Sequence, residues 1–482
     1  MSTSHAARVS VSAAVSRPPG LAALLVMLSG TFMVVLDFFI VNVALPSIQH
    51  DLHAGSAALQ WVVIGYGLAT AVGLISGGRL GDIHGRRRIF MLGIALFVAT
   101  SALCGLAPTA AVLVGARIAQ GAAAALLLPQ VTAMLGGVYS GEQRARAFAA
   151  YGLALGLGAA SGQIIGGLLI DADLGGLGWR SCFLINLPIG GVALLLATRL
   201  LPAPPAQRTS RLDALGAALL ALTLTALLLP LVQGRDAGWP AWSLVALAAS
   251  LPLFVLFWRQ QRHVALRGGQ PLLAPRLITQ CGFALGLLVT LVFYAGNASL
   301  YFVLALYLQR GLGLSPLDSG LVFTALAAGF FVTSMAAPRL GQWLGRQAIF
   351  AGACVLALGH ALMAALVSEA AVPSMAAVVP VLVIQGCGLG MVMAPLVATV
   401  LAGLPAEHAG VAAGVLATVQ QVGNALGVAL IGMVFYGTGS EAPSPAAVIA
   451  GFGPSLVYLL ATSLIAAVLY RRFTTLAKEA TS

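Results

Sequence analysis

Residues 77–90 read GGRLGDIHGRRRIF, a short glycine-rich and basic stretch between two apolar runs. Gly78 and Gly85 permit a tight turn, because glycine accepts backbone conformations that other residues avoid. Asp82 can cap a helix or pair with an arginine. The basic run Arg86–Arg88 favours the cytoplasmic side of a membrane, where short loops carry an excess of lysine and arginine. We therefore predict a cytoplasmic connection between two membrane helices, although a merely topogenic basic loop is an alternative.

A related stretch, APRLGQWLGRQAIF, occupies residues 337–350. Each of the two stretches follows the second apolar run of its half of the chain and precedes the third. Membrane transporters are often built from internal repeats of this kind. The recurrence predicts two homologous helical bundles.

The composition requires lipid as a solvent. Hydrophobic residues make up 60% of the 482 positions and charged residues 8%, whereas about a quarter of the residues in a soluble domain are charged. A membrane helix needs about 20 apolar residues, so fourteen spans occupy roughly 280 positions. This leaves no room for a large soluble domain.

Apolar runs between polar segments predict fourteen spans, and most basic residues fall in the loops that these spans place inside the cell. Arg180, Arg235 and Arg310 fall outside, and Arg117 falls within a span. The net charge of +11 therefore reflects the membrane topology, with both termini cytoplasmic. It does not indicate nucleic-acid binding, which needs basic residues clustered on one face. The predicted spans are 21–45, 57–78, 89–108, 110–135, 147–171, 181–201, 212–233, 242–258, 278–308, 316–338, 348–367, 372–400, 410–436 and 448–470.

The polar breaks between these runs suggest a domain organisation. The proline-rich segment PAPPAQRTSR at 202–211 separates six spans from an added pair, and a second polar break at 259–276 follows that pair. We expect a cytoplasmic tail, a six-helix bundle, a linker with two additional helices, a second six-helix bundle and a short cytoplasmic tail, at residues 1–20, 21–201, 202–276, 277–470 and 471–482.

Four segments together resemble the major facilitator superfamily, and in particular its fourteen-spanner drug:proton antiporter branch. The loop at 78–90 resembles the superfamily's loop signature, with Ile83 where the family often has a basic residue. VLDFFIVNVALPSI at 35–48, RIAQG at 117–121 and GWRSCFLINLPIG at 178–190 are similar to further signatures of that branch. The resemblance implies an all-α membrane fold of two six-helix bundles plus two inserted helices. It also implies a conformational role for the loop residues Gly78, Asp82, Gly85, Arg86 and Arg87.

A ladder of glycines follows in the fifth span, at Gly158, Gly162 and Gly166 with Gly167 adjacent. Spacing by four places these residues on one helix face, where another backbone can approach closely. The ladder resembles the antiporter motif, which implies a hinge and seal between the two halves. Gln163 stands where the family usually has proline, so small-residue packing without a role in antiport is an alternative.

Asp37 and Arg117 are the two charges that lie deep within spans. A charge at the bilayer centre costs roughly 2.5–3.5 kcal/mol on insertion scales, so each must face a partner or a wet cavity. Burial favours a protonated carboxyl and a neighbouring arginine favours the charged form, so a change in access to water or substrate can load and unload a proton. We predict that Asp37 and Arg117 couple transport to protons. A permanent ion pair that merely fixes two helices is the alternative.

Other polar residues within spans are candidates for a substrate cavity. Tyr294, Asn297 and Tyr301 share one helix face, as do Gln420 and Asn424, next to Gln421. Hydrogen bonds between helices would explain these residues equally well. Asn42 and Gln120 complete the candidates, and His360 is expected to be a satisfied packing histidine.

The sequence offers no sign of catalysis or metal binding. It lacks the HExxH and GxSxG patterns, and its five cysteines have no paired spacing, so we expect packing roles for Cys104, Cys182, Cys281, Cys354 and Cys387. The expected function is export of a small lipophilic or cationic drug or an antibiotic, in exchange for protons, through a bacterial inner membrane. The proton gradient is the energy source and no cofactor, enzyme activity or nucleic acid is expected. We expect a monomer in the lipid bilayer, with a facilitator or a proton-coupled transporter of another small metabolite as rivals.

Overall fold

The computed structural model describes residues 20–202, 212–235, 237–273, 275–278, 280–369, 373–402, 404, 409–438 and 444–479. This described part is helical and contains no strand. Fourteen of its helices are long and apolar enough to cross a membrane, which confirms the predicted fold class and the number of spans. The expected N-terminal tail and most of the proline-rich linker lie outside the described residues.

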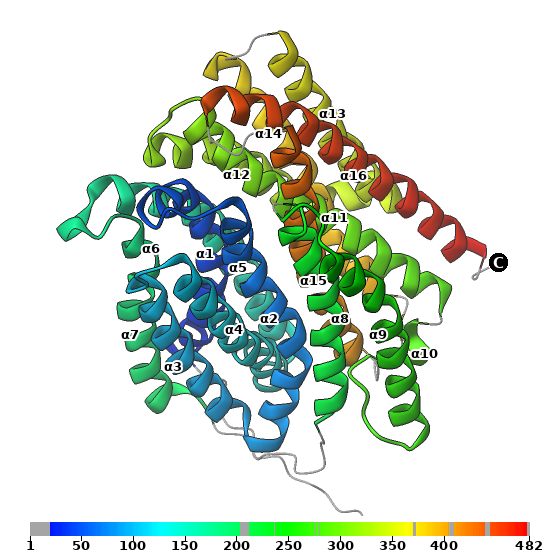
Figure 1. The fold of residues 1–482 in the computed structure, drawn as a ribbon. Coiled ribbons are helices and arrows are strands. Elements are labelled where there is room, and N and C mark those ends of the chain that lie inside the picture. Colours follow the sequence, from blue (N-terminus) through cyan, green and yellow to red (C-terminus); the bar gives the residue numbers. More distant parts are fainter. Residues whose placement is uncertain are drawn as a thin grey trace, which may run out of the picture.

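The first bundle (blue to blue-green in Figure 1) contains six membrane spans. Its last span, Gly178–Leu200, joins a 3₁₀ turn to two consecutive α-helices. Leu174–Gly176 forms another short turn before it. The helices are α1 (Leu21–Asp51), α2 (Ser56–His84), α3 (Arg86–Gly105), α4 (Ala110–Val138), α5 (Gly141–Ala172), α6 (Ser181–Leu184) and α7 (Asn186–Leu200).

The second bundle repeats this order of helices on the other side of the molecule (Figure 1). Its first helix continues without a break into a π-helical turn at Tyr307–Gly311, and a 3₁₀ turn at Gly345–Gln347 joins its second and third helices. The helices are α11 (Cys281–Leu306), α12 (Pro316–Leu344), α13 (Ala348–Glu369), α14 (Met375–Ala402), α15 (Ala409–Phe435) and α16 (Pro445–Glu479).

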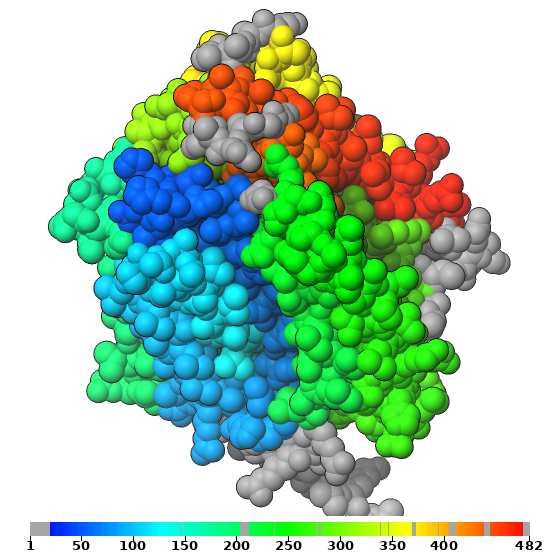
Figure 2. Space-filling view, viewed as in Figure 1, coloured from blue at the N-terminus to red at the C-terminus, as the bar shows by residue number. Residues whose placement is uncertain are grey.

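The inserted pair consists of α8 (Ala214–Gln233) and α9 (Ala241–Leu266), followed by the short α10 (Pro275–Ile278). In the space-filling view this pair (green) covers the face beside the N-terminal half (Figure 2). Its helix α8 contacts both α2 of the first bundle and α15 of the second. The inserted pair therefore lies along one of the two junctions between the bundles.

The loop at 77–90 differs from the prediction in two details. Gly78 lies inside α2, which extends to His84, so the turn depends on Gly85 alone, with a φ of 95°. Asp82 caps no helix: it lies in the last turn of α2 and accepts a hydrogen bond from Arg86 at 2.9 Å. The predicted span ends at residue 78, where the apolar run ends. The helix continues to His84, because polar residues are tolerated where a helix leaves the membrane. The predicted pairing of Asp82 with an arginine is confirmed.

Candidate functional site

The site is built around an ion pair between Asp37 on α1 and Arg117 on α4. Both side chains are 0% exposed, and Nη1 of Arg117 donates to Oδ2 of Asp37. The sequence predicted that these two charges could pair, and the structure brings them together. Because water is excluded, the pair depends on further hydrogen bonds to offset the cost of desolvation.

Two amide side chains supply those bonds. Gln120, one turn after Arg117, donates from Nε2 to Oδ1 of Asp37 at 2.8 Å and accepts from Nη1 of Arg117 at 2.8 Å. Asn186, at the start of α7, donates from Nδ2 to the same Oδ1 at 3.2 Å. Arg117 also donates from Nε to the carbonyl oxygen of Val62 at 3.0 Å. Three helices besides α1 thus hold the pair, and Gln120 belongs to this network rather than to a separate substrate cavity.

A second layer of side chains fixes the first. Asn186 Nδ2 also donates to Oγ of Ser101 at 3.0 Å, and that hydroxyl donates to the carbonyl oxygen of Phe183 at 2.9 Å. The guanidinium carbon of Arg117 lies 4.3 Å from the centre of the Tyr66 ring and 5.6 Å from that of Phe183. This geometry adds cation–π attraction to the buried cation.

Sequence reasoning missed Asn186, Ser101 and Tyr66 as members of the site. One signal was present, since Asn186 is the one amide within GWRSCFLINLPIG, a segment singled out only for its resemblance. Ser101 and Tyr66 gave no such signal, because a serine or tyrosine within an apolar helix is common.

The arrangement can hold one negative charge and can respond to its loss. A carboxylate that accepts three hydrogen bonds, one from an arginine, is stabilised in its charged form, whereas burial opposes that form. Protonation of Asp37 would leave Arg117 as an uncompensated buried cation. Binding of a proton to Asp37 is therefore linked to a change in the surroundings of the Asp37–Arg117 pair.

The glycine ladder lies against α1. A methyl group at Gly162 would stand 3.1 Å from the carbonyl oxygen of Leu36, and one at Gly158 would stand 3.1 Å from that of Phe32. Gly166 similarly contacts Ile40. The ladder thus brings the backbones of α1 and α5 together on the helix that carries Asp37.

The next residue, Gly167, faces the other bundle. A methyl group there would stand 2.5 Å from the carbonyl oxygen of Pro316 on α12. Gln163 lies at the same junction: its Nε2 donates to the carbonyl oxygen of Phe39 at 3.2 Å, and its own carbonyl oxygen lies against Gly320. With glutamine in place of proline, α5 runs through this point as one continuous helix.

The candidate cavity residues divide among several contacts. Gln420 donates to the hydroxyl of Tyr294 at 3.1 Å, which is a bond between helices α15 and α11. Tyr301 stacks on Phe323 at 5.7 Å between ring centres. Asn424 donates to Gln421 at 2.9 Å, and Asn42 donates to carbonyl oxygens of its own helix. The alternative, a hydrogen bond between helices, therefore holds for Tyr294 and Gln420. The structure does not bring these candidate cavity residues together around Asp37.

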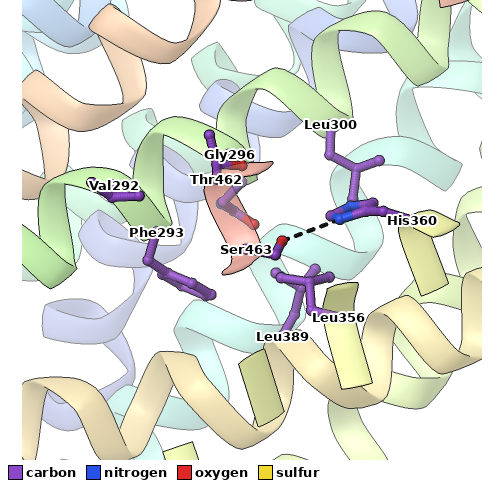
Figure 3. Close-up of a pocket in the computed structure, with 10 residues that line it drawn as sticks. Val292, Phe293, Gly296, Leu300, Leu356, His360, Leu389, Thr462 and Ser463 are labelled. Atoms are coloured by element: carbon purple, nitrogen blue, oxygen red, sulfur yellow. Dashed lines mark hydrogen bonds between the residues drawn. The ribbon is translucent and has the colours of Figure 1, made fainter. Parts of the chain in front are cut away.

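Asn297 and His360 lie in the second bundle, where they line a cavity of about 10 Å³ between α11, α13, α14 and α16. This is about the volume that one buried water needs. His360 contacts Oγ of Ser463 through Nδ1 at 3.1 Å (Figure 3). The hydroxyl of Ser463 donates to the carbonyl oxygen of Leu459 at 2.9 Å, so it accepts from His360. His360 is thus partly satisfied by packing contacts, as predicted, although its Nε2 has no partner in the described part.

The cysteines are unpaired where the structure describes them. Cys104 and Cys182 are buried, whereas Cys354 is exposed, which contradicts its expected packing role. Cys354 lies on α13 at a face turned away from the bundle, a position that an apolar run alone does not distinguish from a buried one. The side chain of Cys281 lies outside the described residues. No group of three possible metal ligands occurs in the described part.

Known proteins resemble this chain over most of its length. It is 41% identical over 427 residues to a probable actinorhodin transporter of Streptomyces coelicolor, covering 87% of this chain and 73% of the relative. It is 36% identical to a cephamycin export protein of Amycolatopsis lactamdurans, covering 93% and 91%. A puromycin resistance protein of Streptomyces alboniger is 35% identical, with 92% and 90% covered.

Solved structures show the same fold at low sequence identity. A D-xylose-proton symporter superposes with a TM-score of 0.66 at 16% identity, covering 94% of this chain and 97% of that one. A peptide transporter in complex with sulfate gives 0.68 at 16% identity, covering 94% of both chains. The family model described as Major Facilitator Superfamily matches residues 27–428. With fourteen membrane helices, two bundles and this match, the chain belongs to the Major Facilitator Superfamily of transporters.

Proposed function

We propose that this protein is a proton-coupled antiporter that exports a small lipophilic or cationic drug, or an antibiotic, from the cytoplasm of a bacterial cell. The observation that carries the proposal is the buried Asp37, held by Arg117 and two amides within one bundle. A membrane protein retains a charge at such depth at a cost of roughly 2.5–3.5 kcal/mol on insertion scales, which favours a functional role.

The relatives support the substrate class. Their names describe a probable transporter of actinorhodin, an exporter of cephamycin and a protein of puromycin resistance. The similarity extends over most of each chain, so it includes both bundles and the inserted pair. An antibiotic or another drug of comparable size is therefore the proposed cargo.

The contacts between the bundles support export by alternating access. Gln309 donates to the carbonyl oxygen of Val43 at 3.0 Å, and Asp171 accepts from the backbone N–H of Leu317 at 3.3 Å. These bonds join the bundles at the end remote from Gly85. We assign that end to the outside, so that Gly85 and both termini face the cytoplasm and the exit is closed in this conformation.

In this mechanism Asp37 takes up a proton when the exit is open and releases it toward the cytoplasm. Moving one charge through the membrane potential yields about 2.3 kcal/mol per 100 mV, which can drive export against a gradient. The proton gradient is the energy source, with no cofactor required. The loop at 77–90 and the contact of α5 with α12 control the exchange of conformations, and the protein works as a monomer with substrate and protons as its ligands.

Measurement of drug-driven proton release from vesicles at several pH values tests the proposal. Asp37→Asn keeps the size of the side chain and its hydrogen bonding but cannot cycle a proton, so uphill export should stop while exchange down a gradient persists. Arg117→Lys keeps the charge but loses the planar fork of donors, so a partial loss and a shifted pH optimum are expected. Exchange of protons at the parental rate in Asp37→Asn would show that the ion pair is a permanent structural one.

A further inference from the structure

Asn186 is one of the two amides that hold the carboxylate of Asp37. Its side chain is fully buried at the start of α7. Its amide nitrogen donates to Asp37 at 3.2 Å and to Ser101 at 3.0 Å. Both hydrogens of that nitrogen are therefore engaged beside the carboxylate.

The amide oxygen of Asn186 is buried and has no partner within the described part of the chain. Leaving a buried acceptor unsatisfied costs about 1–3 kcal/mol, so such atoms are uncommon in native proteins. The opposite orientation of the amide would point its oxygen at the charged Asp37, which is unfavourable. The amide is thus held in one orientation by the charge on Asp37.

Protonation of Asp37 reverses what its neighbours must supply. A carboxylate only accepts hydrogen bonds, whereas a carboxylic acid also has an O–H that needs an acceptor. Oδ2 faces Arg117, so the proton is better placed on Oδ1, which faces Gln120 and Asn186. The amide oxygen of Gln120 already accepts from Arg117 at 2.8 Å. The acceptor that can be brought to Oδ1 is the amide oxygen of Asn186, which now has no partner in the described part, while the amide nitrogen faces Oδ1.

We propose that Asn186 is a positioning residue whose amide turns over when Asp37 is protonated, so that its oxygen accepts the O–H of the acid. A half-turn about the last side-chain bond exchanges the positions of nitrogen and oxygen, and that bond has a broad, roughly two-fold preference. The inference rests on the proposed role of Asp37 as proton carrier.

Ser101 completes the second arrangement. Its hydroxyl now donates to the carbonyl oxygen of Phe183 and accepts from Asn186. After the amide has turned, the hydroxyl rotates and donates to the oxygen of Asn186, which then accepts from both Ser101 and Asp37. The two N–H groups move to the place where the oxygen now has no partner, so the turned amide is favoured only while Asp37 carries the proton. No proton passes between these residues, and the one proton that arrives remains on Asp37.

The other titratable groups around Asp37 do not offer a better acceptor. They are Arg117 on α4, Tyr66 on α2, Cys104 on α3 and Cys182 on α6. Arg117 carries donors only. The hydroxyl of Tyr66 donates to the carbonyl oxygen of Val34 at 3.3 Å, and thiols are weak acceptors.

Infrared difference spectra of the full protein in lipid, recorded over a pH series, test the proposal. The carbonyl stretch of a protonated carboxyl that disappears in Asp37→Asn identifies the acid form of Asp37. With ¹³C-labelled asparagine in the same samples, we expect one side-chain amide carbonyl band to move to lower frequency as Asp37 is protonated, because the oxygen of Asn186 then gains two hydrogen bonds. This movement should be absent in Asn186→Leu and in Asp37→Asn.

Two further variants make the result decisive. Asn186→Ala should lose the movement of the asparagine band in the same way if the leucine variant does not fold. Gln385→Leu removes a buried amide of the second bundle and should retain the movement. An asparagine band that stays in place while Asp37 is protonated would make Asn186 a donor only, and a movement that persists in Asn186→Leu and Asn186→Ala would belong to another asparagine; either result overturns the inference. Absence of the Asp37 band in the parental protein would instead contradict the proposed function.

Discussion

The two bundles each bury a polar centre, and the centres differ in charge. In the first, Asp37 and Arg117 form an ion pair among amide side chains. In the second, Asn297, His360 and Ser463 line a small cavity whose described lining contains no carboxylate, arginine or lysine. We therefore expect the step that depends on a proton to belong to the first bundle.

The duplication makes this comparison specific. The stretch 337–350 lies 260 residues after its counterpart at 77–90, and Asn297 lies 260 residues after Asp37. Both centres draw on the first, third and last spans of their bundle. The second bundle thus carries an amide where the first carries a carboxylate, and the molecule contains its own uncharged version of the site.

Removal of one partner of the ion pair should do the greatest damage to the first bundle. Arg117→Leu should abolish proton exchange and lower the free energy of unfolding by about 3–5 kcal/mol, because it leaves a buried carboxylate without its partner. The double variant Asp37→Asn, Arg117→Leu should recover part of that stability, since no unpaired charge remains. Thermal unfolding in detergent measures both values. A double variant less stable than Arg117→Leu would contradict this account of the pair.

The loops at 77–90 and 337–350 differ in charge at the position of Asp82. Gln342 occupies in 337–350 the place of Asp82 in 77–90, and Gly345 matches Gly85, with φ values of 57° and 95°. Asp82→Asn places a neutral residue at this position of the first loop, as Gln342 does in the second. We expect transport to fall by about 5- to 150-fold, as when a coupling energy of about 1–3 kcal/mol is lost.

The stability of this variant should change little. The Asp82–Arg86 pair is about one-third exposed, and such surface pairs contribute only about 0–1 kcal/mol. Full export activity at normal membrane abundance would show that the loop is merely topogenic. Glu142→Gln, which removes the carboxylate of the more exposed i,i+4 pair with Arg146 at the start of α5, serves as a matched control.

The sequence predicts the spans well because a membrane helix must be long and apolar. Each of the fourteen runs shows these two properties in its own residues, without knowledge of the helices around it. It also identifies Asp37 and Arg117, because a deep charge is conspicuous in an apolar run. Ser101 and Asn186 are different, since they lie 85 residues apart in the sequence and meet only when α3 and α7 pack together. Their role depends on how each helix is rotated about its own axis. A helix that is apolar on every side gives no sign of that rotation in its sequence.

The glycine ladder was visible in the sequence, but its partners were not. Periodicity places Gly158, Gly162 and Gly166 on one face without indicating that the face contacts α1. The adjacent Gly167 contacts α12 instead, in the other bundle. Gly78 shows the opposite case, in which a glycine expected in a turn lies within a helix.

The packing of glycines allows a smaller comparison between the bundles. A methyl group at Gly162 would lie 3.1 Å from the backbone of α1, whereas one at Gly427 of α15 would lie 2.1 Å from the carbonyl oxygen of Ala295 on α11. Gly162→Ala should therefore cost little transport, and Gly427→Ala should cost about 1–3 kcal/mol of stability through overpacking. Gly162→Leu should block or uncouple transport. Wild-type behaviour of both Gly162 variants would show that this face tolerates bulk and does not act as a seal.

Substitution of His360 in the second bundle should change little. Its Nδ1 contacts Ser463, and the described lining of its cavity supplies no carboxylate that would stabilise a charged imidazole. A neutral histidine in such a place acts as a packing and hydrogen-bonding residue, so His360→Gln should lower stability by about 1 kcal/mol. The rate and pH profile of proton exchange in vesicles should match those of the parental protein. Ser463→Ala, which removes the partner of Nδ1, should behave in the same way. A shifted pH profile in His360→Gln together with a parental profile in Ser463→Ala would mean that the imidazole itself takes up a proton, and the second centre would then share the coupling that we assign to Asp37.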